Sequence, residues 1–113
     1  MEVWKKSIEL AEKVYRLSAT FPPDERFGIT SQMRRAVTSV TANIAEGAER
    51  DGTKEFLHFL SIATGSLAET ETFLILAVRL GFVPQETVDP LLDQAATVGR
   101  MLNGLKRSLR LKL

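Results

Sequence analysis

The only histidine in the chain, His58, follows Glu55 by three residues, so the two side chains share a face of a helix. A Glu-x-x-His pair in a helical bundle is half of a di-iron carboxylate site. The other half needs a second histidine, which the chain does not have. Cysteine and a glycine-rich phosphate loop are absent too, and no serine is spaced to pair with an evident base. We therefore expect no metal, no cofactor and no enzymatic activity.

A row of polar side chains occupies the stretch from Ser31 to Gly47 and continues to Arg50. Its members recur every three or four residues beside an apolar stripe of Met33, Val37, Val40 and Ile44. Two polar residues further along the chain, Ser66 and Glu69, are placed to meet this row from another helix. We expect Asn43 to bond to one of these two residues and Arg35 to pair with Glu46 or Glu69. We expect a structural polar layer that sets helix register, with binding of nucleic acid or a partner as the alternative role. The layer comprises Arg35, Ser39, Asn43, Glu46, Ser66 and Glu69.

The basic residues nearly balance the acidic ones, 15 against 14, which leaves a net charge of +1. So small a charge predicts no strong attraction to nucleic acid or to an anionic membrane. The distribution is uneven, however, because the segment 105–113 carries four cations and no acid. These cations either complement the negative end of a helix dipole or contact phosphate. The candidate nucleic-acid contacts are Arg34, Arg50, Lys54, Lys106, Arg107, Arg110 and Lys112.

Helical periodicity covers nearly the whole chain and predicts one domain, residues 1–113, with helices over about 3–19, 30–49, 53–80 and 85–110. Thr30 or Ser31 is expected to cap the second helix and Thr53 the third. The third ends at Gly81, and the fourth begins near Pro84 or afresh at 89–90. No segment has the alternation of a strand. The sequence predicts an all-α fold, an antiparallel up-down-up-down four-helix bundle.

The third helix carries two overlapping apolar seams, although a bundle needs only one from each helix. We expect the surplus surface to meet another subunit. The candidate oligomer interface comprises Phe59, Ile62, Phe73, Leu76 and Leu80. Gly65 lies in the middle of this helix, where glycine costs about 1 kcal/mol relative to alanine. The expected reason is close approach of a neighbouring helix at Gly65–Ser66.

Several motifs together resemble a known family. SQMRRA at 31–36, NIAEG at 43–47, Arg50, Phe56 and the segment 63–66 with Glu69 are similar to the bacterial four-helix-bundle family of 23S rRNA intervening-sequence proteins. The resemblance implies a bundle that assembles into a ring-like homopentamer. A related branch is the accessory protein of diversity-generating retroelements, which binds reverse transcriptase and nucleic acid. Relatives often have Arg-Gly-Ser in the third helix, where this chain has Thr64-Gly65-Ser66.

Two functions remain open on this basis. The first is a nucleic-acid or ribonucleoprotein accessory module, in which several copies of a weak basic patch act together. The second is a protein-interaction or assembly scaffold with no nucleic-acid role. The start of the chain lacks the pattern of a secretory signal, and the longest apolar runs are shorter than a membrane span. We therefore expect a cytoplasmic protein that does not act at a membrane.

Overall fold

The computed structural model describes residues 1–113 and contains four α-helices, one short 3₁₀ turn and no strand. Each α-helix begins and ends within one residue of the range expected from periodicity. The elements in chain order are α1 (Glu2–Ser18), η1 (Pro23–Glu25), α2 (Ile29–Ala48), α3 (Thr53–Arg79) and α4 (Gln85–Arg110).

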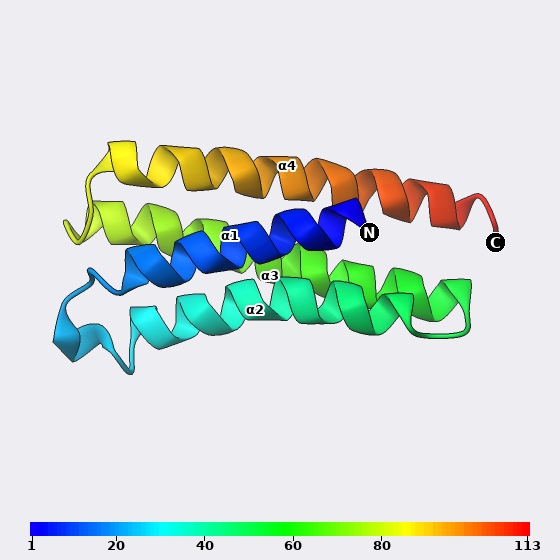
Figure 1. Ribbon diagram of the computed structural model, residues 1–113, viewed down its shortest axis with the longest axis horizontal. Coiled ribbons are helices and arrows are strands. Elements are labelled where there is room, and N and C mark those ends of the chain that lie inside the picture. The colour runs from blue at the N-terminus through cyan, green and yellow to red at the C-terminus, as the bar shows by residue number, and fades with distance from the viewer.

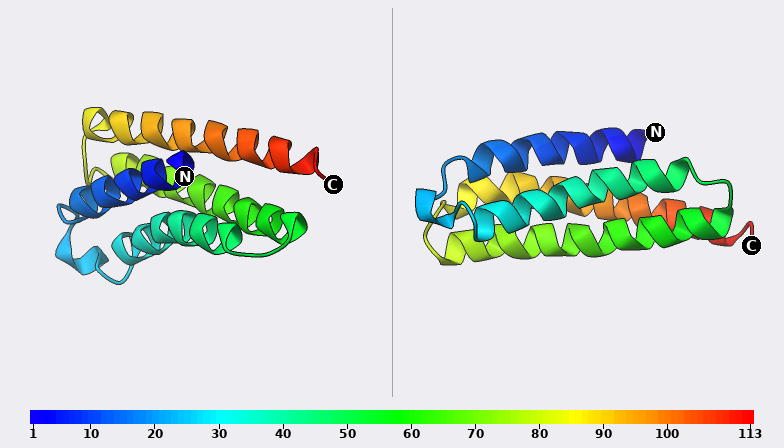
Figure 2. Two further views of the ribbon diagram at one scale, coloured as in Figure 1. Left: turned by 45° about the vertical axis from the view of Figure 1, so that its right-hand side comes forward. Right: turned by 90° about the horizontal axis from the view of Figure 1, so that it is seen from below.

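The helices alternate in direction and form the expected antiparallel four-helix bundle, 46 × 24 × 19 Å in extent (Figure 1). Each helix lies next to the helices before and after it in the chain, and α4 closes the ring against α1, while the backbones of the diagonal pairs lie farther apart (Figure 2). The contact between α2 and α3 is the most extensive. Because α1 is the shortest of the four, the α2–α3 turn and the last turns of α4 extend beyond its first residue (Figure 1).

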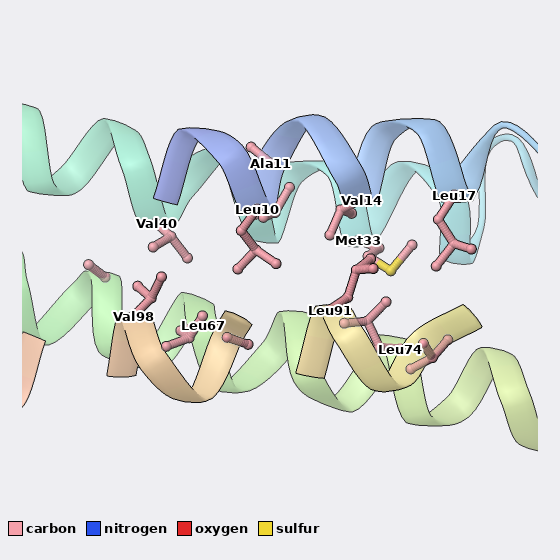
Figure 3. Close-up of a cluster of buried hydrophobic side chains, with 14 of the residues drawn as sticks. Leu10, Ala11, Val14, Leu17, Met33, Val40, Leu67, Leu74, Leu91 and Val98 are labelled. Atoms are coloured by element: carbon pink, nitrogen blue, oxygen red, sulfur yellow. The ribbon is translucent and has the colours of Figure 1, made fainter. Parts of the chain in front are cut away.

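The core lies along the axis of the bundle and takes side chains from every helix. Figure 3 shows those of α1 and α2 directed toward those of α3 and α4. Full burial of one such leucine or valine contributes about 1.5–3 kcal/mol relative to leaving it exposed. The labelled core residues include Leu10, Val14, Met33, Val40, Leu67, Leu74, Leu91 and Val98, which are all at least nine-tenths buried.

Glycines, not hydroxyl side chains, precede two of the helices. The carbonyl of Gly28 accepts from the N–H of Gln32, and that of Gly52 accepts from the N–H of Phe56. The helix α2 therefore starts two residues earlier than a cap at Thr30 requires, and α3 starts one residue earlier than a cap at Thr53 requires. The predicted caps at Thr30 or Ser31 and at Thr53 are wrong, because glycine occupies both N-cap positions.

The connection from α3 to α4 follows one of the two predicted alternatives. Gly81 ends α3 with a φ of 78°, a left-handed conformation that glycine adopts without a steric penalty. Pro84 immediately precedes α4, so the helix does not begin at Asp89, and Pro90 lies inside its second turn. Proline has no N–H to donate at that position, and the loss is least disruptive near the start of a helix.

The close approach expected at Gly65 occurs at another glycine. A Cβ atom at Gly65 would meet nothing within 4 Å, so the prediction is wrong within the chain. A Cβ atom at Gly47 of α2 would lie 2.8 Å from Cβ of Phe59 and 3.0 Å from Cδ1 of Phe56. Gly47 therefore permits the tight packing of α2 on α3, and Gly65 has no packing role inside the bundle.

By length and composition alone, α3 could cross a membrane, and it is the one helix that meets this criterion. The core helix of a bundle meets the same criterion. In this structure the buried face of α3 packs against α2 and α4, with Leu60, Leu67 and Leu74 at its centre.

Candidate functional site

The polar row of α2 lies at the junction with α3 and includes one bond between the two helices. The hydroxyl oxygens of Ser39 and Ser66 are 2.8 Å apart. Nδ2 of Asn43 donates to the carbonyl oxygen of Ser39 at 2.8 Å and to its hydroxyl at 3.0 Å. Ser66 is buried, and Ser39 and Asn43 are half-buried. These three side chains form a small hydrogen-bonded cluster that ties α2 to α3.

The remaining members of the expected polar layer do not join this cluster. Arg35 and Glu69 are exposed and make no ion pair within 4 Å. Glu46 accepts from Nη2 of Arg50 at 2.8 Å, because Arg50 stands one helical turn further along. The expected pairing of Arg35 with Glu46 or Glu69 is therefore wrong, as is the expected bond from Asn43 to α3.

An open groove of ≈ 420 Å³ runs beside the Ser39–Ser66 bond on the outside of the bundle. Its walls carry charges of both signs and aromatic rings from three segments, including Arg35, Glu69, Phe27 and Phe73. Charged groups without an ion-pair partner beside aromatic surface give this groove the character of a contact surface.

Six of the seven candidate nucleic-acid contacts, all but Arg34, belong to one end of the bundle, where the α2–α3 turn lies beside the end of α4 (Figure 1). At the turn, carboxylates neutralise the positive charge of Arg50. Its guanidinium pairs with Glu46 and lies 3.8 Å from Glu55, and the hydrogen bond to Glu46 raises the pKa of Arg50 further above its ordinary value. In the last turn of α4 and just after it, in contrast, Arg107, Arg110 and Lys112 are exposed and have no carboxylate within 4 Å.

Lys106 is not available as a phosphate contact, which corrects the expectation from sequence. Only 8% of the residue is exposed, and its Nζ donates to the hydroxyl of Thr64 on α3 at 3.0 Å. The structure thus places a cation from α4 beside Thr64, where the family resemblance leads us to expect arginine.

Arg34 has a structural role in addition to any contact with a ligand. Its Nε donates to the hydroxyl of Ser18 at 2.8 Å, and Nη2 donates to the carbonyl of Tyr15 at 3.2 Å. The carbonyl of Tyr15 also accepts from the N–H of Ala19 and from the hydroxyl of Ser18, so the guanidinium adds a further bond at the end of α1. It also lies 4.7 Å from the centre of the Tyr15 ring.

The candidate oligomer interface is only partly covered by the chain itself. Ile62, Leu76 and Leu80 of α3 are 39%, 40% and 53% exposed. Phe73 is half-buried in the groove, and we call these four residues the α3 strip. Phe59 is half-buried as well, beneath the guanidinium of Arg50 at 4.8 Å, and we leave it out of the strip.

Three residues that the sequence analysis did not single out belong to a second basic surface. Phe27, in the α1–α2 connection, is 83% exposed. The guanidinium of Arg26 lies 4.8 Å from the centre of its ring, and Tyr15 supports Arg34 in the same region. An aromatic residue next to an arginine in a loop that follows two prolines was the available signal.

No group of three or more histidine, aspartate or glutamate side chains is arranged to hold a metal ion. The fold and these surfaces define a class of protein, an antiparallel helical bundle with an uncovered apolar strip and exposed arginines. The chain matches the family described as 23S rRNA-intervening sequence protein over residues 1–104 and belongs to that family, which confirms the resemblance.

A solved structure supports the same assignment. The chain is similar to a protein of unknown function from the S23 ribosomal protein family of Bacteroides thetaiotaomicron, known from its crystal structure. The two share 26% sequence identity with a TM-score of 0.85, and the match covers 92% of this chain and 97% of the other. No curated protein gives a significant match.

Proposed function

We propose that this protein is a non-catalytic, self-associating helical bundle that acts as an accessory module to nucleic acid or a ribonucleoprotein. The observation that carries the proposal is the unneutralised basic end of α4. Arg107, Arg110 and Lys112 are exposed there without a carboxylate partner, although the chain as a whole is nearly neutral.

Self-association is the second part of the proposal, and the α3 strip supports it. Large apolar side chains exposed together on one helix face are typical of protein–protein contacts. Gly65 supports the same proposal. Glycine lowers the stability of α3 at this position, and no packing within the chain compensates for that loss. A position without a side chain allows close contact with another subunit. The family resemblance implies that the assembly is a ring of five copies.

Assembly of several copies would allow the basic end of α4 to bind nucleic acid more tightly than one chain can. Three cations on one chain bind phosphate weakly at physiological salt. Several copies held in one assembly bind the same strand with a high effective concentration, so that weak contacts act together. Lys54, at the same end and exposed, is a fourth candidate contact on each chain.

The test measures the affinity for a labelled single-stranded RNA over a range of salt concentrations, with the variant Arg107→Gln, Arg110→Gln, Lys112→Gln. The affinity is expected to fall, and the slope against salt to become shallower by about 0.7 for each phosphate that the variant no longer neutralises. The matched control is Lys5→Gln, Lys6→Gln, Lys13→Gln on α1, which removes the same charge and is expected to retain most of the affinity. Equally weakened binding in both variants would contradict a specific role for the end of α4.

A protein-interaction scaffold is the alternative function, and the groove between α2 and α3 favours it. Its aromatic rings and unpaired charges suit a protein partner as well as they suit a second copy. Under this alternative the wild-type protein binds no RNA or DNA at low salt, and removal of the α4 cations leaves partner binding intact.

A further inference from the structure

A second basic surface lies at the other end of the bundle, where the α1–α2 connection meets the first turns of α2 (Figure 1). A cleft of ≈ 330 Å³ at this corner is lined by three arginines, Arg26, Arg34 and Arg35, with the rings of Tyr15 and Phe27 and several hydroxyl groups. No carboxylate lines it. We call it the corner cleft.

One arginine of the corner cleft is held in place before any ligand arrives. Arg34 is fixed by its bonds to Ser18 and to the carbonyl of Tyr15, and by its position over the Tyr15 ring. These bonds use Nε and one hydrogen of Nη2, so three of the five guanidinium N–H donors remain free. A fixed cation loses little side-chain entropy on binding an anion.

The other two arginines have no carboxylate partner within 4 Å. The guanidinium of Arg35 donates no hydrogen bond within the chain, and that of Arg26 lies over the ring of Phe27. The nearest acidic residues along the chain are Asp24 and Glu25. Oε1 of Glu25 lies 3.5 Å from the N–H of Ile29, and neither carboxylate lines the cleft.

The same cleft also contains a neutral hydroxyl group. Thr30 lines the corner cleft, and 7% of the residue is exposed. It belongs to the first turn of α2, where the backbone N–H groups have no acceptor within the helix and only that of Ile29 donates to a side chain, Oε1 of Glu25 at 3.5 Å. The cleft therefore presents neutral donors together with cationic ones, as oxyanion sites at helix starts do.

The aromatic component distinguishes the possible ligands. Phe27 is the most exposed aromatic side chain of the molecule at 83%, and Arg26 covers one face of its ring. The other face is open for stacking. A free anion or an acidic peptide would use the arginines and leave this ring in water, whereas an unpaired base would cover it.

We propose that the corner cleft binds one nucleotide of a single-stranded nucleic acid, with its phosphate at the arginines and its base stacked on Phe27. The ligand class rests on the proposed function, but the residues are different from those at the end of α4. The two surfaces lie at opposite ends of the bundle, so their contributions to binding can be separated by mutation.

The first experiment measures the affinity for a fluorescein-labelled single-stranded RNA of about twelve nucleotides by fluorescence anisotropy. Phe27→Ala is expected to weaken binding on the order of tenfold, and Phe27→Trp to restore it, because stacking needs an aromatic face. Ile75→Ala, which removes another exposed apolar side chain, is the matched control and is expected to leave the affinity unchanged. On binding, the ring signals of Tyr15, the single tyrosine, are expected to shift in the NMR spectrum.

The second experiment tests the phosphate contacts through the salt dependence. Arg26→Gln with Arg35→Gln is expected to make the slope of affinity against salt shallower by about 1.4, or about 0.7 for each phosphate left without its arginine. The control, Arg79→Gln with Arg100→Gln, removes two exposed arginines outside the cleft and is expected to leave the slope unchanged.

Four results would overturn the inference. In the first, both cleft variants bind RNA as tightly as the wild type, and only the α4 variant loses binding. The proposed function then still holds, but the cleft is not a binding site. Equal affinity for a duplex of the same length excludes stacking of an unpaired base. If Phe27→Ala lowers the mass of the assembly and leaves the RNA affinity unchanged, the ring contacts a second copy of the chain instead of a base. Absence of RNA and DNA binding by the wild type removes both proposals.

Discussion

At the residue scale, Glu71 is the carboxylate whose pKa is clearly changed by its surroundings. It is half-buried on α3 and has no ion-pair partner within 4 Å. Burial raises the pKa of its carboxyl above the ordinary value, because the ionised form loses hydration without gaining a cation. The folded state therefore binds a proton at Glu71 more tightly than the unfolded state does.

This shift predicts a pH-dependent effect of Glu71→Gln. A raised folded-state pKa contributes stability that is complete below the ordinary pKa and disappears as the pH rises through the raised value. Because glutamine resembles the neutral carboxyl, the variant is expected to be more stable than wild type at about pH 7, with the gain disappearing near pH 4. Urea unfolding midpoints at both pH values measure the effect.

Glu69→Gln serves as the control for this prediction. Glu69 is exposed and lies two residues earlier on the same helix, so its replacement is expected to change the midpoint little. A gain for Glu71→Gln that is equal at the two pH values would show that titration is not its cause.

At the scale of helices, the packing of α2 on α3 depends on the absence of a side chain at Gly47. A Cβ atom there would lie 2.8 Å from Cβ of Phe59, an atom too near the backbone to swing aside. The glycine near the end of α2 is therefore explained by the close contact of the two helices, which are also joined by the Ser39–Ser66 bond.

We expect Gly47→Ala to destabilise the protein by about 1 kcal/mol. Overpacking costs about 1–3 kcal/mol, and the better helix propensity of alanine recovers at most about 1 kcal/mol. Gly104→Ala on α4 isolates the propensity effect, because its Cβ would meet nothing within 4 Å, and it is expected to be stabilising. The free energy of unfolding in urea distinguishes the two. A stabilised Gly47→Ala would mean that α2 and α3 separate without cost.

At the scale of the whole molecule, the proposed self-association requires a surface that can meet another copy of the chain. The α3 strip and the groove beside it lie on one side of the bundle, and the exposed Ile75 lies on α3 outside the strip. Adjacent residues of a helix point about 100° apart, so Leu76 and Ile75 lie on different faces of α3.

We expect Leu76→Glu to disrupt self-association, because a carboxylate in an apolar contact loses hydration without a partner. Ile75→Glu introduces the same charge at an equally exposed position and is expected to leave the assembly intact. The absolute mass from light scattering on a sizing column measures the result. The wild type is expected near five times the 12.6 kDa of one chain, and Leu76→Glu is expected to shift toward a single chain. A wild-type mass equal to that of one chain would contradict the proposed self-association.

Much of the fold follows from local sequence patterns. The periodicity of apolar residues placed every helix to within one residue, because the period of a helix is a property of neighbouring positions. The helix caps at Thr30 and Thr53 were predicted wrongly, since glycine can start a helix as well as a hydroxyl side chain can.

The candidate site could be predicted only in part. The basic end of α4 and the apolar surplus of α3 are visible along the chain, because each belongs to one helix. The corner cleft is not visible, because Tyr15, Phe27 and Arg35 belong to three different segments that meet only in the bundle.

The sequence alone determined the helices, their antiparallel order and the family, because these depend on the local pattern and on motifs. Tertiary structure decided which cations are free. Arg34 donates a hydrogen bond to Ser18, which is 16 residues away in the sequence, and Lys106 donates one to Thr64, which is 42 residues away. A hydrogen bond between such distant residues forms only when two helices pack in one register. Whether a lysine is buried beside a hydroxyl or exposed to a phosphate is therefore a property of the folded bundle.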